Sequence, residues 1–184
     1  MTRITNTIAE RIAQAVTEHA FAERLAAARQ RLADAGMAAY RTYYGDETIE
    51  KMTSLPEGWL STRSRLDLTI NGCRYMVNLG QPMPVLAEDT VEWFNLDGDT
   101  AEAMEIQHAE QDFQRLRSER KEALREAERA IKRFGTVKAL IRGWPEIEPF
   151  AREFLDAYPA LPAVIPADLN AKLGLPVTEE GHTK

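Results

Sequence analysis

Apolar side chains recur at helical spacing through the first part of the chain. The members of this stripe are Ile8, Ile12, Val16, Leu25 and Leu32. Because such spacing places them on one face, the stripe predicts a long helix over residues 7–35. Thr7 and Glu10 have the spacing of a capping box at its start, and Gly36 interrupts the stripe. A shorter helix is expected over residues 46–54.

Beyond residue 60 the pattern changes to the two-residue alternation of a β-strand. The alternating apolar residues are Leu66, Leu68 and Ile70. Asn71-Gly72 follows them, and both residues tolerate the positive φ of a type I′ turn. The sequence therefore predicts a β-hairpin with strands at about 65–70 and 73–79. In this register Ile70 faces Cys73, and one side of the hairpin is wholly apolar.

The hairpin needs further support, because a two-stranded ribbon is only marginally stable alone. Val85–Leu86 and Val91–Phe94 are two candidates for a third strand. Pro82 and Pro84 restrict the first candidate to the edge of a sheet, since proline has no N–H to donate. Both candidates remain open at this point.

A second long helix is predicted over residues 99–134, where apolar residues follow alternating three- and four-residue steps. They are Ile106, Ala109, Phe113, Leu116, Ala123, Ala127, Ala130 and Phe134. This seam suits antiparallel packing against the first helix, or a dimer contact. Arg120 within the seam argues against a tight homodimer. Short, proline-punctuated helices are expected over 136–176, followed by a frayed tail over 177–184.

These elements predict an α+β fold that is mainly helical, with two long helices packed on a small antiparallel sheet. The 184 residues, 44% hydrophobic and 28% charged, fit a globular protein with a single domain over residues 1–184. Residues 55–98 hold the hairpin and an acidic loop. The sequence shows no signal peptide and no membrane-spanning apolar run. The lone Cys73 excludes an intrachain disulfide and suits a reducing cytoplasm.

The charge of the chain is concentrated in one segment. Residues 75–114 contain nine Asp or Glu and no Lys or Arg, whereas the segments before and after it carry net charges of +1 and +2. The sum of +1, −9 and +2 is the formal net charge of −6. Such a surface repels phosphate backbones and attracts basic partners, which disfavours direct nucleic-acid binding through residues 75–114.

Candidate catalytic and metal-binding groups have simpler structural explanations. Glu105 and His108 have the spacing of one half of a di-iron site, but no second Glu-x-x-His occurs, so an exposed helix face is favoured. Residues 95–99 resemble a calcium loop without its closing Glu, and a turn that precedes a helix is favoured. Cys73 is expected to be a buried, inert thiol. The chain has three histidines. Besides His108, neither His19 nor His182 lies near a nucleophile motif. No catalytic, cofactor-binding or metal-binding residue is predicted, which favours a non-enzymatic role without deciding it.

The most specific candidate surface is the loop that begins the second long helix. It places two aromatic side chains among five carboxylates: Glu88, Asp89, Glu92, Trp93, Phe94, Asp97 and Asp99. Acidic groups around an aromatic anchor suit a protein-docking loop better than a nucleic-acid surface. A merely solvated acidic loop remains the alternative.

Several short sequence segments together resemble phage and prophage proteins grouped as nucleotide modification associated domain family five. They are Thr2–Asn6, Ala20–Arg24, Tyr44–Asp46, Met52–Leu60, Thr136–Leu140, Trp144–Phe150, Leu161-Pro162 and Asp168–Pro176. The similarity covers most of the chain and departs from the family pattern between Gly80 and Thr100, around the acidic loop.

The resemblance implies a small bacteriophage protein in the cytoplasm of the bacterial host, without catalytic residues to carry over. We expect a non-enzymatic accessory protein that binds a host protein with a basic surface, for example a nucleic-acid-binding defence or replication factor. One alternative is an enzyme or subunit that takes part in phage DNA or nucleotide modification. A second is a self-associating structural protein, with a homodimer left open.

Overall fold

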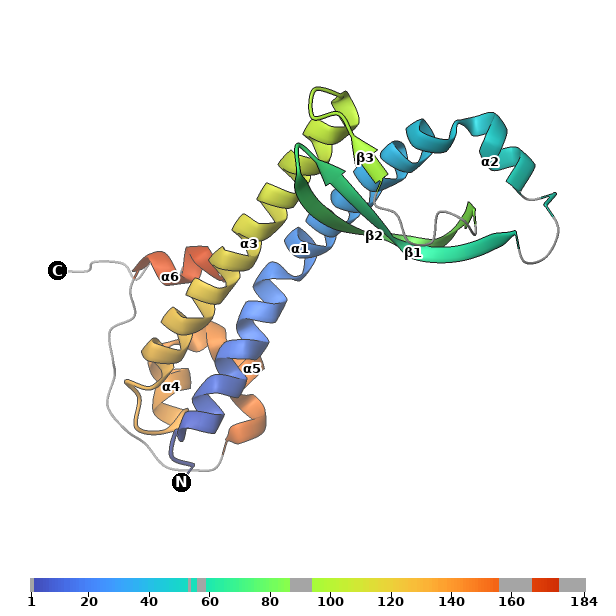
Figure 1. The fold of residues 1–184 in the computed structure, drawn as a ribbon. Coiled ribbons are helices and arrows are strands. Elements are labelled where there is room, and N and C mark those ends of the chain that lie inside the picture. Colours follow the sequence, from blue (N-terminus) through green and yellow to red (C-terminus); the bar gives the residue numbers. More distant parts are fainter. Residues whose placement is uncertain (1, 53, 56–58, 87–93, 156–166, 176–184) are drawn as a thin grey trace. The chain divides into compact units, whose positions relative to one another are not determined.

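The computed structural model describes residues 2–52, 54–55, 59–86, 94–155 and 167–175 (Figure 1). Its elements are α1 (Asn6–Tyr44), α2 (Asp46–Met52), β1 (Leu60–Ile70), β2 (Cys73–Leu86), β3 (Phe94–Leu96), α3 (Ala101–Ile131), α4 (Val137–Gly143), α5 (Glu148–Ala151) and α6 (Ala167–Lys172), with short 3₁₀ helices at Pro145–Ile147 and Arg152–Phe154. Helices predominate and the strands form one small sheet, so the predicted α+β class is confirmed. No helix within the described ranges is both long enough and apolar enough to span a bilayer.

The chain divides into two compact units, which are described separately. The first contains the described residues up to Arg24 and those from Leu116 onward, and the second is Leu25–Arg115. Both long helices contribute residues to each unit. Side-chain pairs show that α1 and α3 run antiparallel: Glu18 with Arg120 and Arg24 with Glu119 in the first unit, and Arg31 with Asp112 and Thr42 with Glu102 in the second. The seam of α3 therefore packs within one chain, which is the predicted antiparallel packing against the first helix.

The hairpin of the second unit has the predicted turn and register. Asn71 and Gly72 have φ angles of 49° and 75°, as a type I′ turn requires, and Ile70 pairs with Cys73. The strands are longer than predicted, because pairing continues beyond a register shift between Arg63 and Arg65. This irregularity lets β1 and β2 stay paired as far as Leu60 and Leu86.

The third strand is short and runs parallel to β1. In β3, Phe94 pairs with Leu68 and Leu96 pairs with Ile70, which gives the strand order β2-β1-β3. Val85–Leu86, the other candidate, is the end of β2 instead. Because β2 lies at the edge of the sheet, Pro82 and Pro84 are tolerated there, as expected.

The first helix does not end near Gly36 but continues to Tyr44. A Cβ atom at position 36 would lie 2.6 Å from Val77 Cγ1 and 2.9 Å from Leu79 Cδ2. Gly36 therefore provides room for β2 rather than interrupting the helix. The start of α1 also differs from the prediction, since the side chain that caps it is Thr5, whose Oγ1 accepts a hydrogen bond from the Ile8 amide at 3.3 Å.

The core of the second unit lies between the sheet and the helices α1 and α3. Its buried members are Leu32, Ala35, Ala39 and Tyr40 from α1; Leu66, Leu68, Ile70, Val77, Leu79, Val85 and Phe94 from the sheet; and Ala103, Ile106 and Ala109 from α3. The Tyr40 hydroxyl donates a hydrogen bond to the Pro84 carbonyl and lies 3.8 Å from Met52 Sδ. Tyr40 thus joins α1, α2 and β2, and its burial raises the pKa of its phenol.

The first unit packs the start of α1 and the end of α3 against the C-terminal helices. Trp144 is fully buried, and its Nε1 donates to Asn170 Oδ1 at 2.7 Å. Thr136 caps α4 by accepting from the Ala139 amide at 3.2 Å, and an antiparallel bridge joins it to Arg3. Among the short helices expected over 136–176, α5 covers only Glu148–Ala151 and is followed by a 3₁₀ turn to Phe154. The predicted frayed tail lies outside the described residues.

Gly36→Ala tests the close approach of α1 and β2. Alanine at an exposed helical position would stabilise by up to about 1 kcal/mol relative to glycine. Here the new methyl group meets the stiff, β-branched Val77, and overpacking typically costs about 1–3 kcal/mol. We expect a lower free energy of unfolding, measured by urea denaturation.

Gly135→Ala is the matched control, because an added Cβ there has no neighbour within 4 Å. It should leave the free energy of unfolding nearly unchanged. Adding Val77→Ala to Gly36→Ala should cost less than the two single substitutions sum to. A Gly36→Ala variant as stable as the wild type would refute this account of the packing.

Candidate functional site

The structure describes three of the seven residues predicted for the docking loop. Asp97 and Asp99 are exposed, in the turn between β3 and α3. Neither forms a salt bridge within the described part of the chain. Glu88, Asp89, Glu92 and Trp93 lie outside the described residues.

Phe94 is part of the core and is not an exposed anchor. It is 6% exposed, and its ring packs edge-on against Tyr43 with a centroid distance of 4.4 Å. Its backbone pairs with Leu68 in the sheet, which directs the side chain toward the helices. The exposed aromatic ring at this place is Tyr43, which is 48% exposed. An aromatic group therefore does lie near the acidic turn, but α1 supplies it.

The resemblance of residues 95–99 to a calcium loop has a structural explanation. The Asp99 amide donates to Asp97 Oδ1 at 3.1 Å, and Thr100 Oγ1 donates to the Asp97 carbonyl at 2.7 Å. Thr100 then caps α3 by accepting from the Ala103 amide at 3.3 Å. Gly98 leaves room for the Asn71 side chain, since a Cβ there would lie 2.0 Å from Asn71 Nδ2. The segment is a turn that precedes a helix cap, as predicted.

Arg31 of α1 neutralises part of the acidic stretch. Its Nε and NH2 donate to the two carboxylate oxygens of Glu105 at 2.7 and 3.1 Å, and its NH1 donates to Asp112 at 2.7 Å. These hydrogen bonds lower the pKa of Glu105 and raise that of Arg31. Two of the nine acidic groups in residues 75–114 therefore already have a basic partner, one that lies far from them in sequence.

The same contact accounts for the Glu105–His108 pair. Both oxygens of Glu105 bind Arg31, and His108 is exposed on the next turn. Across the described ranges, no cluster of three or more His, Cys, Asp or Glu side chains is arranged to hold a metal ion. Glu105 is therefore half-buried in a contact between α3 and α1, and His108 lies on the exposed face of α3.

Cys73 is exposed, contrary to the prediction of a buried thiol. It lies in the predicted register beside Ile70, but it begins its strand next to the turn, where the apolar face has reached its end. His19 packs on Phe150 with ring centroids 5.4 Å apart. His182 lies outside the described residues.

The acidic groups in the second half of α3 have partners on the same helix and on α6. Glu128 binds Lys132 one turn away. Glu126 binds Lys172 of α6 at 3.1 Å. Glu122 has no hydrogen bond or ion pair within the described residues.

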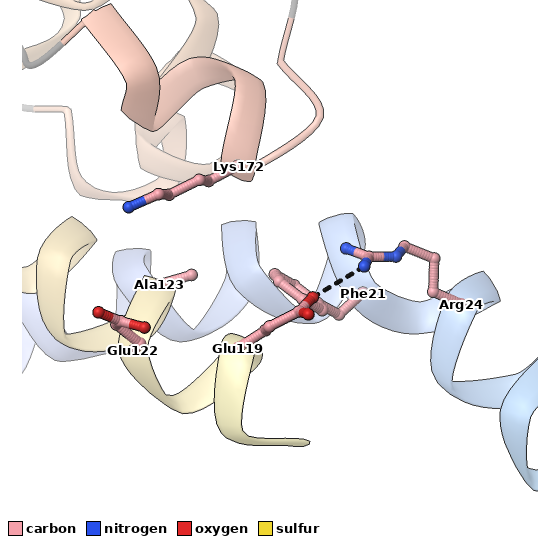
Figure 2. A pocket seen from close by; sticks show the side chains of 6 residues that line it. All are labelled: Phe21, Arg24, Glu119, Glu122, Ala123 and Lys172. Carbon is pink, nitrogen blue, oxygen red and sulfur yellow. Dashed lines mark hydrogen bonds and ion pairs between the residues drawn. The ribbon is translucent and has the colours of Figure 1, made fainter. Parts of the chain in front are cut away.

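This arrangement leaves a cavity of about 200 Å³ in the first unit (Figure 2). Its lining residues are Phe21 and Arg24 of α1, Glu119, Glu122 and Ala123 of α3, and Lys172 of α6. Figure 2 shows Phe21 and Arg24 on α1, Glu119, Glu122 and Ala123 on α3, and Lys172 on α6, with Arg24 bound to Glu119 at 2.9 Å. Phe21 and Ala123 are each 2% exposed.

The cavity was not predicted from the sequence, because its residues come from three separate helices. A signal was nevertheless present in the family resemblance. Phe21 and Arg24 belong to the segment Ala20–Arg24, and Lys172 belongs to Asp168–Pro176. The cavity joins these two segments in space.

A comparison with protein-family models identifies one that matches residues 3–176, described as "Nucleotide modification associated domain 5". The match includes the acidic stretch and all the residues that line the cavity. No curated protein and no solved structure is significantly similar to the chain.

Substituting Arg31 tests its role among the acidic groups. Arg31→Gln should raise the pKa of Glu105 toward its ordinary value, because the hydrogen bonds that favour the carboxylate are lost. A depressed pKa stabilises the folded state above the ordinary carboxyl pKa, and this contribution is lost as the pH falls through the folded-state value. The Glu105 titration, followed by NMR of its side-chain carbonyl, should therefore move to higher pH.

Arg41→Gln removes an equal charge from the same helix without touching Glu105 and should leave that titration in place. An unchanged Glu105 pKa in Arg31→Gln would show that the contact is not maintained in solution.

Proposed function

The chain belongs to the family described as nucleotide modification associated domain 5, and we propose that it is a non-enzymatic bacteriophage accessory protein that binds a host protein through the acidic surface of residues 75–114. The partner has a basic surface, as nucleic-acid-binding defence or replication factors have. The observation that carries the proposal is the absence of any Lys or Arg among forty residues that hold nine acids.

The described residues show which acidic groups of this surface are available to a partner. Arg31 already binds Glu105 and Asp112, so these two groups contribute less to an outside partner. Asp97 and Asp99 are exposed and lie beyond β3, whose Phe94 packs on the half-exposed Tyr43. An exposed ring near carboxylates that form no salt bridge with the described residues supports protein docking, because aromatic anchors and complementary charge recur in protein interfaces. Glu88, Asp89, Glu92 and Trp93 complete the proposed surface.

Two further roles were open from the sequence. The family description supports a component, enzyme or subunit, of phage DNA or nucleotide modification as the second candidate. Self-association was suggested by the apolar seam of α3. Three residues of that seam, Ala123, Ala127 and Ala130, are buried within their own unit, so the seam gives no particular support to a dimer.

A pull-down from host lysate tests the first proposal. The wild-type chain should capture a specific protein, and Asp97→Asn/Asp99→Asn should capture much less of it. Added salt should weaken the capture, since exposed charges are screened within about 10 Å at 0.1 M. Asn retains the side-chain oxygen that closes the turn, so the local fold is kept.

The matched control is Asp34→Asn/Glu47→Gln, which removes two exposed acids of the same unit outside residues 75–114. It should capture the partner as the wild type does. Failure to recover any specific partner, or equal loss in the control, would count against the acidic surface.

The second candidate predicts a chemical change in phage DNA. Deleting the gene should alter the nucleoside composition of that DNA, measured by mass spectrometry of a complete digest. Restoring the gene should restore the composition. An unchanged digest would exclude a required part in the modification itself.

A further inference from the structure

The first unit contains a segment of positive charge that is the counterpart of the acidic stretch in the second. Residues 129–145 hold five Lys or Arg and no Asp or Glu. They are Arg129, Lys132, Arg133, Lys138 and Arg142, and all five are exposed. The net charge of −6 for the whole chain conceals this segment, whose concentrated positive charge attracts anions.

The fold adds a further base from the start of the chain. An antiparallel bridge joins Arg3 to Thr136, and backbone hydrogen bonds of 3.2 Å on either side support it. Figure 1 shows the start of α1 beside the turn that connects α3 to α4. Arg3 is exposed, and residues 1–9 contain no acid. Arg3 therefore joins Arg133 and Lys138, which stand three residues before and two residues after Thr136.

Two arginines of α3 extend this positive end of the first unit. Arg125 and Arg129 are four residues apart, so they lie on neighbouring turns of one helix face, about 6 Å apart along the axis. Arg133 follows after four more residues, in the turn beyond the helix end. These three arginines, together with Arg3 and Lys138, are called the basic ridge. Each of the five is exposed.

The basic ridge has no counter-charge of its own among the described residues. None of its five side chains forms an ion pair or a hydrogen bond there. Glu126 and Glu128 of α3 each bind a lysine that does not belong to the ridge. Glu122 lies three residues before Arg125 but forms no ion pair with it. The ridge can therefore bind an anion from outside without breaking an existing pair.

The helix dipole explains only part of the basic ridge. Bases at the end of a helix are favourable because the backbone carbonyls there carry partial negative charge. This accounts for Arg129, in the last turn of α3, and for Arg133 just beyond it. Arg125 precedes that turn, whereas Arg3 and Lys138 belong to other segments of the chain. Their convergence on one end of the unit requires another explanation.

The composition of the ridge favours a nucleic-acid duplex over a single strand or an acidic protein. Within the described part of the first unit, Leu155 is the only large apolar side chain that is exposed. The ridge thus has no aromatic ring on which an unpaired base could stack, nor the aromatic anchor that is typical of protein interfaces. Arg and Lys side chains are donors only, which suits phosphate oxygens. They offer no acceptor for the 2′-OH through which proteins recognise RNA, so DNA is favoured.

We infer that the basic ridge binds the phosphate backbone of double-stranded DNA without reading its sequence. Phosphate contacts of this kind supply affinity and position a protein, whereas base contacts supply specificity. The inference goes beyond the proposed function, because it assigns a second partner to the other unit. Residues 75–114, which repel phosphates, belong to the second unit and stay available for the protein partner.

Fluorescence anisotropy with a labelled DNA duplex of arbitrary sequence tests this inference. The wild type should bind, and log affinity should fall with log salt by about 0.9 for each phosphate contact between about 50 and 200 mM salt. Arg125→Gln/Arg129→Gln should weaken binding to all sequences alike and reduce that slope by about 2. Arg3→Gln/Lys138→Gln should have the same effect, which tests whether the bridge brings Arg3 into the surface.

The matched control is Arg29→Gln/Arg41→Gln, which removes two exposed arginines from α1 in the second unit. It should keep the wild-type affinity and salt slope. All the substituted side chains are exposed, and circular dichroism verifies that the helices persist. Single-stranded DNA and duplex RNA of equal length should bind more weakly than duplex DNA.

No binding at the lowest salt, an unchanged slope in either ridge variant, or an equal loss in the control would overturn the inference. Tighter binding of single-stranded DNA or of duplex RNA would also overturn it. Equal competition by polyglutamate would do so as well, because it would identify a surface for acidic proteins.

The pull-down and the DNA titration can fail independently. Capture of the host protein depends on Asp97 and Asp99 of the second unit, and nuclease treatment of the lysate prevents capture through DNA. Nuclease-resistant capture with a failed titration would leave the proposed function in place and remove the basic ridge as a DNA surface. The opposite result would support the ridge and count against the acidic surface.

Discussion

Small residues along α1 and α3 determine how closely these helices approach their neighbours, and both compact units are built on that approach. In the second unit, Gly36 admits the side chains of Val77 and Leu79, while Ala103 and Ala109 bring α3 into the same core. In the first unit, buried alanines fill the corresponding role: Ala9, Ala13, Ala123, Ala127 and Ala130. Interiors are packed as densely as organic crystals, so the positions of the sheet and the C-terminal helices depend on these small side chains.

Local patterns predicted the elements that local interactions determine. The Asn71-Gly72 turn requires positive φ at both residues, and that requirement alone set the register of Ile70 against Cys73. The same reasoning failed at Gly36, because glycine lowers helix propensity by only about 1 kcal/mol and tertiary packing can exceed that amount. Phe94 was similarly misread, since its burial depends on Tyr43 and Tyr44 from a distant helix.

The ion pairs that determine the charge distribution could not be predicted from local patterns either, because they join segments that are distant in sequence. Arg31 precedes Glu105 and Asp112 by more than seventy residues, and only the antiparallel packing of α1 on α3 brings them together. Lys172 of α6 likewise binds Glu126 of α3, from which it is separated by 46 residues in sequence. The carboxylates that remain without a basic partner are therefore not simply those of the most acidic segment. Residues 75–114 are partly neutralised, whereas Glu122, in a balanced segment, has no hydrogen bond or ion pair among the described residues.

The outer edge of β2 limits how the sheet can grow. Edge strands expose unpaired N–H and C=O groups, which serve as templates for the strands of other molecules. Pro82 and Pro84 have no N–H to offer, and the Pro84 carbonyl is occupied by the Tyr40 hydroxyl. A strand from a neighbouring copy would find neither donors nor that acceptor along this stretch. Tyr40 and the two prolines therefore disfavour edge-to-edge pairing along this stretch of β2.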